Sequence, residues 1–338
     1  MNILFTCAGR RNYLLQYFKN VLSGNGNVVA ADMQATAPAM ADADKAIVVP
    51  GVYESKYIDS LLEICHSEKI QGILSLNDLE LPILAAAREQ FDAAGVKLIV
   101  SNETVIEICF DKHKTNLFAE SLNIKTPHTF LSLADAKTAL LKGTLAFPLV
   151  IKPRWGSASI GIEFPESMEE LELAYILLTK KLTRSILSKA SNAEPEQAIL
   201  IQEKINGIEY GLDILNDFSG KPAQVYVKEK LAMRAGETDK AVLRNIPALE
   251  EMGFQIAHAL SHIGNLDCDI FESNGEYYLL EMNPRFGGGY PFSHMSGANY
   301  PAAIIAWLEG KEYDFSSFQK IYDQAYAKCD TLIKIGNE

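Results

Sequence analysis

Three polar side chains occupy alternate positions in the stretch LLEMNPRFGGGYP (279–291). Glu281 and Asn283 are two residues apart, so they share one face of a strand. Carboxylate and amide oxygens suit a hard cation such as Mg²⁺, and the guanidinium of Arg285 can bind the oxygens of an anion. Gly287–Gly289 would let the backbone approach a substrate where a Cβ would intrude. The stretch therefore predicts a magnesium–nucleotide site beside a bound anionic substrate.

The upstream segment DCDIFESNGEYYLLEMN adds another acid, Asp269, and a hairpin turn at Asn274-Gly275. A strict two-residue turn would put Asp269 and Glu281 on opposite faces of the hairpin. A three-residue loop or a β-bulge would bring them side by side. Asp269, Glu281 and Asn283 are therefore metal-ligand candidates only if the hairpin has one of these irregularities. Otherwise its acids simply face water.

Two further stretches have residue types that suit a nucleotide site. In VIKPRWGSASIGI, Lys152 precedes a loop that contains Ser157, and the backbone N–H groups of such a loop can bind phosphates. The helix-based pattern GxxxxGK[ST] is absent. ILIQEKINGIEYGLDIL places Glu203, Ile205 and Glu209 around the end of an apolar strand, where an extended segment can bind adenine and a carboxylate can bind ribose. Taken alone, the first stretch is as compatible with a flexible hairpin as with a phosphate site, and the second favours a plain β-hairpin with solvated charges.

The first hundred residues alternate short apolar strands with amphipathic helices, which predicts a doubly wound parallel sheet. Ligands gather at the carboxyl ends of such strands. Those ends carry Arg10, Arg11, Asp32 and the pair Asn77-Asp78. Arg10 could bind an anion there or simply face solvent. A dinucleotide-dependent oxidoreductase is the weaker alternative, because CAGRRNYL after the first strand lacks the GxGxxG spacing.

The pattern of apolar and turn residues changes after about residue 104. There, strand–turn–strand patterns predict an α+β region with a mostly antiparallel sheet. A helix carries Lys112, and FPLVIKPRWGSASIGIEF reads as two antiparallel strands joined by a loop. A helical stretch from about Ser167 to Lys189 follows.

Composition limits the classes of function. The 338 residues carry a formal charge of −12, which argues against a nucleic-acid partner. No apolar run approaches the roughly 20 residues of a membrane span, and the N-terminus lacks the pattern of a secretory signal. Five scattered cysteines without a CxxC pair suggest neither a disulfide framework nor a zinc site. We therefore expect a cytoplasmic protein with no membrane partner.

In order, the motifs DK (111–112), VIKP (150–153), the Gly/Ser loop, IQEKINGIEYGLDI and DIFESNGEYYLLEMNPR resemble those of the ATP-grasp superfamily. Around LLEMNPR the chain is similar to biotin carboxylase, carbamoyl-phosphate synthase and amino-acid ligases. The resemblance implies an α/β preATP-grasp domain with a parallel sheet, followed by an α+β ATP-grasp fold. The implied boundaries are 1–104 for the preATP-grasp domain, 105–126 with 202–312 for the antiparallel catalytic core, 127–201 for the lid, and 313–338 for a C-terminal extension.

The resemblance also implies roles for individual residues. Lys112, Lys152 and Ser157 would contact ATP phosphates, Glu203 and Ile205 would frame adenine, and Glu209 would bind ribose. Asp269, Glu281 and Asn283 would hold two Mg²⁺ ions, with Mn²⁺ as an alternative. Arg285 and Lys152 are the catalytic candidates, and Arg285 would face the transferred phosphoryl group. The candidates for the substrate are Arg10, Asn77, Asp78, Arg234 and Gly288, and Arg244 belongs to the same expected loop as Arg234.

The implied activity is an ADP-forming carboxylate–amine ligase with ATP as cosubstrate. A small-molecule carboxylate becomes an acyl phosphate, which an amine or amino acid then attacks. One alternative is a carbamoyl-phosphate-synthase-like subunit that makes an acyl or carboxy phosphate for a partner. Another is a catalytically silent nucleotide-binding regulator. Relatives also suggest a homodimer.

Overall fold

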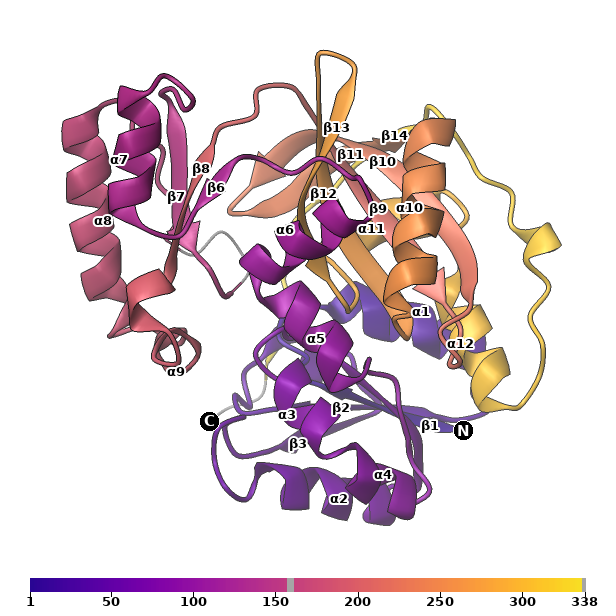
Figure 1. Cartoon of the computed structure of the whole chain (residues 1–338). Helices are drawn as coiled ribbons and strands as arrows, with labels where there is room; N and C mark the ends of the chain where they lie inside the picture. The colour runs from indigo at the N-terminus through magenta and orange to yellow at the C-terminus, as the bar shows by residue number, and fades with distance from the viewer. Residues whose placement is uncertain (157–160, 336–338) are drawn as a thin grey trace.

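The computed structural model describes residues 1–156 and 161–335, which form three β-sheets with their covering helices (Figure 1). A five-stranded sheet lies in the N-terminal domain, a three-stranded sheet lies in a separate lobe, and a six-stranded sheet lies between the lobe and the C-terminal helices. The two predicted regions, one with a parallel sheet and the next an α+β region with an antiparallel sheet, are confirmed.

The N-terminal sheet is parallel throughout, with strand order β3-β2-β1-β4-β5. Its inner strands β1, β2 and β4 are apolar on both faces because helices cover both, as in other parallel sheets. The order reverses between β1 and β4, so the loops after these two strands lie side by side. The elements are β1 (Asn2–Thr6), α1 (Asn12–Leu22), β2 (Asn27–Asp32), η1 (Pro38–Ala41), β3 (Lys45–Val48), α2 (Tyr57–Ser67), β4 (Ile70–Ser75), α3 (Leu81–Ala86), α4 (Arg88–Ala93) and β5 (Lys97–Leu98).

The segment ELPILAAAREQFDAAG forms two short helices, α3 and α4, which are divided at Ala87. Leu84 and Phe91, one on each side of the break, are both fully buried. The change of direction at Ala87 therefore lets both short helices pack an apolar side chain on the sheet.

The three-stranded sheet of the lobe has the order β6-β8-β7, and α7 and α8 pack on it (Figure 1). Among the residues described after Pro153, an isolated bridge between Ile151 and Glu163 stands where a second strand was expected after the Gly/Ser loop. The expected long helix ends at Leu182 instead of continuing to Lys189. The elements are β6 (Thr129–Phe130), α7 (Leu133–Leu141), β7 (Leu149–Pro153), α8 (Met168–Leu182), α9 (Ser188–Ser191), η2 (Pro195–Gln197) and β8 (Ile199–Glu203).

The six-stranded sheet is antiparallel, with strand order β13-β12-β9-β10-β11-β14. One face packs on α10, α5 and α6 through an apolar cluster that includes Leu212, Val225, Val227 and Leu266. Alternate residues point to the opposite face, which carries charged side chains. The elements are α5 (Glu103–Phe110), α6 (Lys112–Ser121), β9 (Ile208–Asn216), β10 (Pro222–Arg234), β11 (Glu237–Leu243), α10 (Pro247–Leu260), β12 (Gly264–Ser273), β13 (Glu276–Asn283), α11 (Tyr290–Met295), α12 (Tyr300–Leu308), η3 (Phe315–Ser317) and β14 (Ala325–Ala327).

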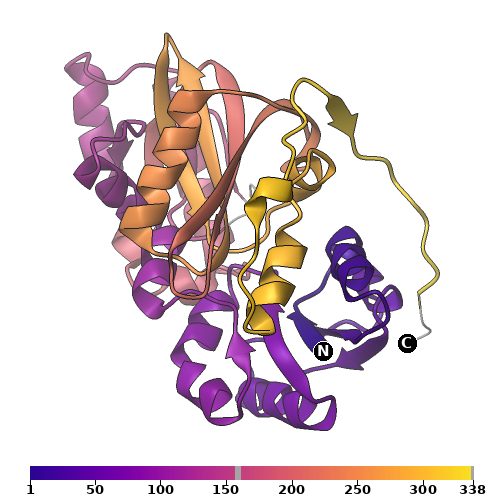
Figure 2. The ribbon, with the colours of Figure 1, turned by 90° about the vertical axis from the view of Figure 1, so that its right-hand side faces the viewer.

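Strands β8 and β9 follow each other directly in the sequence but belong to different sheets. The segment between them is therefore a connection from the lobe to the central sheet, and the simple β-hairpin considered for this stretch does not form. After α12 the chain runs back along the central sheet, where β14 adds the sixth strand beside β11 (Figure 2). Among the described residues, no helix has both the length and the apolar character needed to cross a bilayer.

Candidate functional site

A β-bulge brings the predicted metal ligands together. The turn at Asn274-Gly275 has two residues, both with positive φ (54° and 80°), as predicted. Ladder pairing is regular as far as Ile270 opposite Leu279, and then it shifts so that Asp269 lies opposite Glu281. Leu280 is the extra residue of the bulge. The expected condition, that the hairpin contains an irregularity, is confirmed.

The bulge also changes which face of β13 carries which side chains. Leu279 and Met282 both pack in the apolar cluster below the sheet, although they are three residues apart. A regular strand would put Leu279 and Glu281 on the same face. Because the bulge reverses the alternation, Glu281 and Asn283 reach the charged face together with Asp267 and Asp269 of β12.

Asp269 is held by Lys230, which extends from the middle of β10. The Lys230 ammonium lies 2.5 Å from an Asp269 carboxylate oxygen and 2.7 Å from a Glu209 carboxylate oxygen. Burial raises the pKa of Asp269 to about 7, against the opposing effect of Lys230. Burial alone would lower the pKa of Lys230, but Asp269 and Glu209 outweigh it and raise that pKa. Lys230 thus stays charged between two carboxylates.

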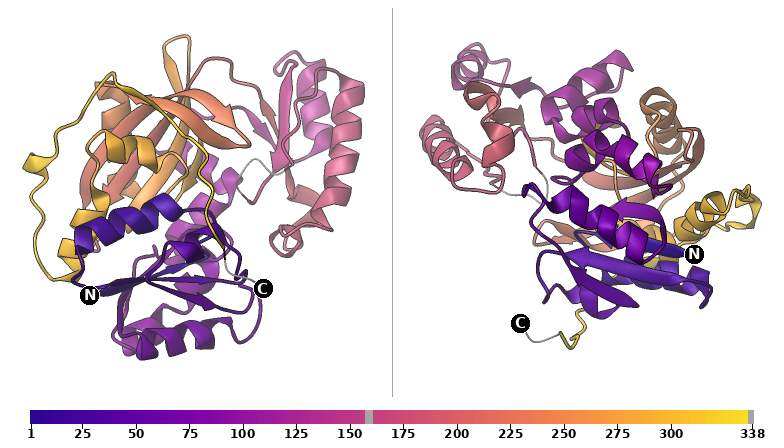
Figure 3. Two further views of the ribbon diagram at one scale, coloured as in Figure 1. Left: turned by 180° about the vertical axis from the view of Figure 1, so that it is seen from behind. Right: turned by 90° about the horizontal axis from the view of Figure 1, so that it is seen from below.

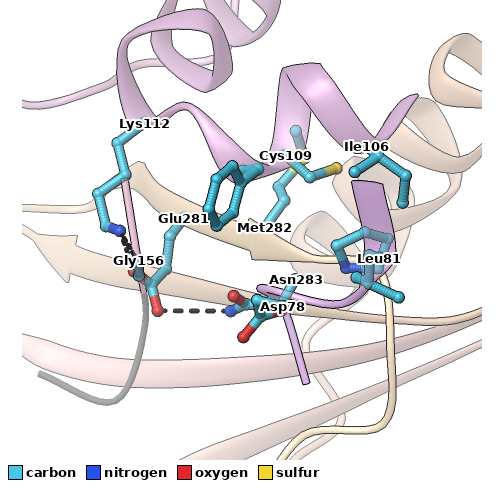
Figure 4. A pocket seen from close by; sticks show the side chains of 11 residues that line it. Asp78, Leu81, Ile106, Cys109, Lys112, Gly156, Glu281, Met282 and Asn283 are labelled. Carbon is cyan, nitrogen blue, oxygen red and sulfur yellow. Dashed lines mark hydrogen bonds and ion pairs between the residues drawn. The ribbon is translucent and has the colours of Figure 1, made fainter. Parts of the chain in front are cut away.

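Glu281 is influenced by two nearby cations, Lys112 and Lys152. Its carboxylate is 3.6 Å from the Lys112 ammonium, which also donates to the carbonyl of Gly156 (Figure 4). The amide of Asn283 donates to Glu281 at 3.4 Å. Burial tends to raise the pKa of Glu281, but Lys112 and Lys152 outweigh burial and lower it. Glu281 is therefore an ionised acid at neutral pH.

These residues fit a hard divalent cation only together with additional ligands. No group of three or more His, Cys, Asp or Glu side chains within 1–156 and 161–335 is arranged to hold a metal. Asp269 and Glu281 are directly paired across the hairpin, and the Asn283 amide adds one oxygen on the same face. Mg²⁺ commonly takes one or two carboxylates and completes its shell with water and phosphate oxygens. The donor set fits such a shared site.

Arg285 is fixed by acids from two domains. Its guanidinium lies 2.7 Å from Asp78 of the N-terminal domain and 3.5 Å from Asp267 of β12. Burial would lower its pKa, but Asp78 and Asp267 outweigh burial and raise it. Asp267 is linked further to Lys228, and Lys228 lies 2.6 Å from the fully buried Asp213. Charges of alternating sign thus run from the central sheet to the N-terminal domain.

A cavity of about 420 Å³ opens between the lobe and the central sheet. Lys112 and Lys152 lie in its wall, and Lys152 is only 5% exposed. Burial and the neighbouring Lys112 lower the pKa of Lys152 to about 8. The wall also contains the predicted residues Glu203, Ile205 and Glu209 and a set of apolar side chains, namely Val150, Ile162, Phe164, Met233, Phe271 and Leu280. We call this space the first pocket.

A second pocket of about 220 Å³ lies beside the first, and Met233, Gly236, Asp269 and Glu281 line both. Its wall combines residues from the two domains. The N-terminal domain supplies Arg11, Leu76, Asn77 and Asp78, and the central sheet and the glycine segment supply Lys230, Glu237, Thr238, Asp267, Asn283, Arg285, Gly288 and Gly289. The carboxyl ends of β1 and β4 therefore contribute to the pocket, as expected for a parallel sheet.

The glycines after Arg285 have different surroundings. A Cβ on Gly287 would lie 2.1 Å from a carboxylate oxygen of Asp267, so glycine is needed there for the protein's own packing. A Cβ on Gly288 would lie 3.0 Å from Arg11 and from Glu237, at the wall of the second pocket. Of these two glycines, Gly288 lines the second pocket and Gly287 does not.

Some predicted residues lie away from these pockets. Arg234 forms ion pairs with Asp239 and Asp330 at the surface, and Arg244 pairs with Glu229 and Asp323. Arg10 is exposed, and neither it nor Arg234 lines the first or the second pocket. Ser157 lies outside the described residues.

Asp32, the residue that could have bound a nicotinamide cofactor's ribose, accepts hydrogen bonds from the backbone N–H groups of Gly9 and Gln34. Its carboxylate thus holds the loop after β1. This geometry gives the oxidoreductase alternative no support.

Sequence reasoning missed Asp267, Lys228, Lys230 and Glu237, which line the second pocket or support it. A usable signal was present in two strands. DCD places Asp267 and Asp269 on one face of β12, and VKEK places Lys228 and Lys230 on one face of β10. Arg11, named only as part of a strand end, is the arginine there that reaches the pocket.

Two family models match separate parts of the chain. Residues 3–99 match the family described as PylC-like, N-terminal domain. Residues 195–329 match the family described as ATP-grasp in the biosynthetic pathway with Ter operon. The second match contains the β12–β13 hairpin, Arg285 and most of the six-stranded sheet. Residues 195–329 belong to the ATP-grasp superfamily.

Curated relatives include the carbamoyl phosphate synthase large chain of Thermoanaerobacter sp. (strain X514), which is 25% identical over 69% of this chain and 21% of its own length. The C-terminal section of that large chain from Aquifex aeolicus is 23% identical over 86% of this chain and 51% of its own length. This chain thus spans between a fifth and half of the length of these relatives.

Solved structures share the ATP-grasp fold over nearly the whole chain. The biotin carboxylase of Campylobacter jejuni, in a complex with β-γ-ATP, superposes with a TM-score of 0.73 at 17% identity and covers 94% of this chain and 73% of its own. The L-amino acid ligase of Bacillus licheniformis gives a TM-score of 0.70 at 19% identity, with coverages of 95% and 77%. Identities this low establish a shared fold.

Proposed function

We propose that this protein is an ADP-forming carboxylate–amine ligase that uses ATP and Mg²⁺. The observation that carries the proposal is the meeting of the two pockets at Asp269 and Glu281. One pocket has the size and residues for a nucleotide, and the other has the charged groups for small polar substrates. A phosphoryl group held at the junction would be accessible from both.

The first pocket would bind ATP. Its apolar residues, such as Phe271 and Leu280, would contact the adenine, and Glu203 and Ile205 lie in the connection from β8 to β9 where an adenine edge could be held. Glu209 would accept hydrogen bonds from ribose hydroxyls. Lys112 and Lys152 supply positive charge for the phosphates. Ser157 belongs to this proposal by the sequence motif alone.

Asp269, Glu281 and Asn283 would hold the magnesium ions. Bound there, Mg²⁺ supplies positive charge that lets a carboxylate approach the γ-phosphorus and that stabilises the transferred phosphoryl group. Lys230 already contacts Asp269, so it helps to hold that carboxylate in place. The similar biotin carboxylase domain of Hydrogenobacter thermophilus was solved with MgADP and bicarbonate, and as a dimer. We extend magnesium use, and a homodimer, to this chain as part of the proposal.

Arg285 would bind the acceptor carboxylate and the acyl phosphate. Asp78 accepts hydrogen bonds from its Nε and Nη2 and Asp267 accepts one from its Nη1, and the side chain lines the second pocket. A carboxylate oxygen attacks the γ-phosphorus and ADP leaves. The amine nitrogen then attacks the acyl carbon, releases inorganic phosphate and loses a proton. In both steps the protein positions reactants and stabilises charge.

A related function has its own support. The similarity to carbamoyl phosphate synthase large chains, of which this chain spans only a part, favours a version in which the acyl or carboxy phosphate is passed to a partner chain. A silent regulator would bind ATP without releasing ADP.

The test is ADP release with Mg²⁺ and ATP against pools of small carboxylates, each with and without amino acids, other amines and ammonia. Release that needs both a carboxylate and an amine supports the ligase. Release with bicarbonate or a carboxylate alone supports the partner-dependent function. ATP binding without ADP release in any pool, or any need for nicotinamide cofactor, contradicts the ligase proposal.

A further inference from the structure

The C-terminal segment, residues 318–335, forms a strap along the edge of the central sheet. It follows η3, pairs with β11 through β14, and then runs toward the N-terminal domain (Figures 2 and 3). The register places Ala327 opposite Lys240, and the Lys328 N–H donates to the carbonyl of Asp239 at 2.8 Å. Lys328 is thereby fixed near the start of β11.

The Lys328 ammonium lies 3.1 Å from one carboxylate oxygen of Glu237. The other oxygen of Glu237 accepts a hydrogen bond from Arg11 of the N-terminal domain at 3.0 Å. Glu237 begins β11 of the central sheet. One carboxylate thus joins the strap, the central sheet and the N-terminal domain, and it does so in the wall of the second pocket.

The second pocket contains five acidic side chains, and their exposure separates them. Asp78 and Asp267 contact Arg285 and have 8% and 13% of their side chains exposed. Asp269 and Glu281 are the proposed metal ligands, with 22% and 24% exposed. Glu237 is 46% exposed, about twice as much as any other. Among the acids that line this pocket, Glu237 is the most accessible to a ligand.

Glu237 also has lone-pair positions left with which to bind a ligand. Each carboxylate has about four lone-pair positions, and the two cations use one on each oxygen. Partial burial would raise the pKa of Glu237, but Arg11 and Lys328 outweigh burial and lower it, so the group is ionised at neutral pH. Gly288 lies directly beside this carboxylate in the pocket wall, and a Cβ there would come within 3.0 Å of it.

Once an anionic acyl phosphate is bound, the charges of the second pocket favour a ligand with a positive group, because the lining groups by themselves balance. If Asp269 and Glu281 are occupied by magnesium, the remaining charged lining groups are Arg11, Lys230 and Arg285 against Asp78, Glu237 and Asp267. Both signs are then equally represented. Arg285 would bind the acyl phosphate, so the cationic group of a second substrate would find its accessible acid at Glu237.

We propose that Glu237 binds the ammonium group of the amine substrate, and that Lys328 of the C-terminal strap is the positioning residue that presents Glu237 to it. This inference rests on the proposed ligase function, since it assigns the amine to the second pocket. It gives the strap a part in substrate selection. A purely structural strap would only cover the edge of β11.

The experiment measures binding without turnover. Calorimetry would use the full chain with Mg²⁺ and a non-hydrolysable ATP analogue, and a panel of free amino acids and small diamines, each paired with its analogue that lacks the amine. The variants are Glu237→Gln, Lys328→Met, Lys328→Arg and the matched control Asp323→Asn. Asp323 lies on the same strap and pairs with Arg244, outside the second pocket.

We expect at least one ammonium-bearing compound to bind the wild type, with its amine-free analogue binding more weakly. Glu237→Gln should weaken that binding roughly tenfold or more, as for a lost charge-assisted hydrogen bond. Lys328→Met should weaken it several-fold, Lys328→Arg should restore it, and Asp323→Asn should match the wild type. The affinity for the ATP analogue should not change in any variant.

Three results would overturn the proposal: no ammonium-bearing compound binds the wild type, binding survives in Glu237→Gln, or Lys328→Met and Asp323→Asn behave alike. Because no turnover is needed, these results are independent of the ADP-release test. Ligase activity that persists with unchanged amine affinity in Glu237→Gln would contradict this inference and leave the ligase proposal standing.

Discussion

At the scale of single residues, the junction of the two pockets is controlled by the charges around one cross-strand pair. Burial raises the pKa of Asp269 to about 7, whereas the lysines near Glu281 outweigh burial and lower its pKa. Two carboxylates that face each other across a hairpin therefore differ in ionisation near neutral pH. A bound divalent cation would favour the ionised form of both.

Glu281→Gln tests the role assigned to this pair. The amide is nearly isosteric but carries no charge, so we expect magnesium-dependent ADP release to fall by at least about a hundredfold while the far-UV circular dichroism stays unchanged. A magnesium titration of ADP release would measure it, with Glu276→Gln, at the exposed start of β13, as the control. Near-normal activity in Glu281→Gln would remove this residue from the metal site.

If Lys152 binds the phosphates as proposed, ATP affinity should depend on pH. Burial and Lys112 lower its pKa to about 8, so the free protein holds Lys152 protonated below that pH and loses the proton above it. Phosphates favour the charged lysine, so the affinity for ATP measured without Mg²⁺ should fall as pH rises through 8. Calorimetry from pH 6.5 to 9.5 would measure it. Lys152→Arg should keep its affinity through this range, and a wild type with level affinity to pH 9.5 would exclude Lys152 from the phosphate site.

At the scale of elements, the hairpin β12–β13 determines which residues meet. The pairing of Asp269 with Glu281 depends on one extra residue, Leu280, between two otherwise regular ladders. The side chains at 281 and 283 reach the charged face because the alternation restarts after the bulge.

Deleting Leu280 would leave a regular ladder in which Leu279 still faces the core and Glu281 still faces Asp269. We therefore expect the deletion variant to keep its magnesium dependence, with a weaker affinity for ATP because Leu280 also lines the first pocket. Magnesium and ATP titrations of ADP release would separate the two effects. Leu280→Ala, which keeps the bulge, is the matched control. A folded deletion variant without magnesium dependence would contradict the register argument.

Much of the fold follows from local patterns in the sequence. Alternating strands and helices specified the parallel sheet, and Asn274-Gly275 specified the turn, because both depend on residues close together in the chain. The break at Ala87 and the separation of β8 from β9 depend on tertiary packing, so the sequence did not show them. The bulge could be named only as one of two possibilities, because its position depends on which side chains the core accepts.

The site followed the same division. Lys112, Lys152, Glu203, Glu209 and Glu281 lie in motifs, and the structure brings them to the first pocket. Glu237, Arg11 and Lys328 come from three distant segments, and only the packing of the strap against β11 shows that they meet. Residues that meet only in the folded chain have no local sequence pattern that identifies them.

At the scale of the whole molecule, the second pocket exists because the N-terminal domain packs against the central sheet. Asp78 follows β4, and its ion pair with Arg285 crosses this boundary with both side chains 8% exposed. The N-terminal domain thus orients the arginine that would bind the acyl phosphate.

Asp78→Asn should therefore weaken both the domain contact and the chemistry. Asp78 accepts two hydrogen bonds from Arg285, and asparagine removes the negative charge from them, so the free energy of unfolding should fall by about 1.5–3 kcal/mol while Arg285 keeps Asp267. The turnover number should fall at least about tenfold, with ATP affinity near that of the wild type. Urea unfolding and steady-state kinetics would measure these. Asp59→Asn, at an exposed position of α2, is the control, and equal behaviour of the two variants would contradict the coupling.

The most direct measurement of the central claim is isotope transfer from the substrate. The carboxylate found by the ADP-release test would be labelled with ¹⁸O, and the inorganic phosphate formed during turnover would be analysed by mass spectrometry. If the carboxylate attacks the γ-phosphorus, each phosphate released should carry one ¹⁸O atom from it. Phosphate without ¹⁸O, in the presence of product, would show that the carboxylate is not activated as an acyl phosphate and would contradict the proposed function.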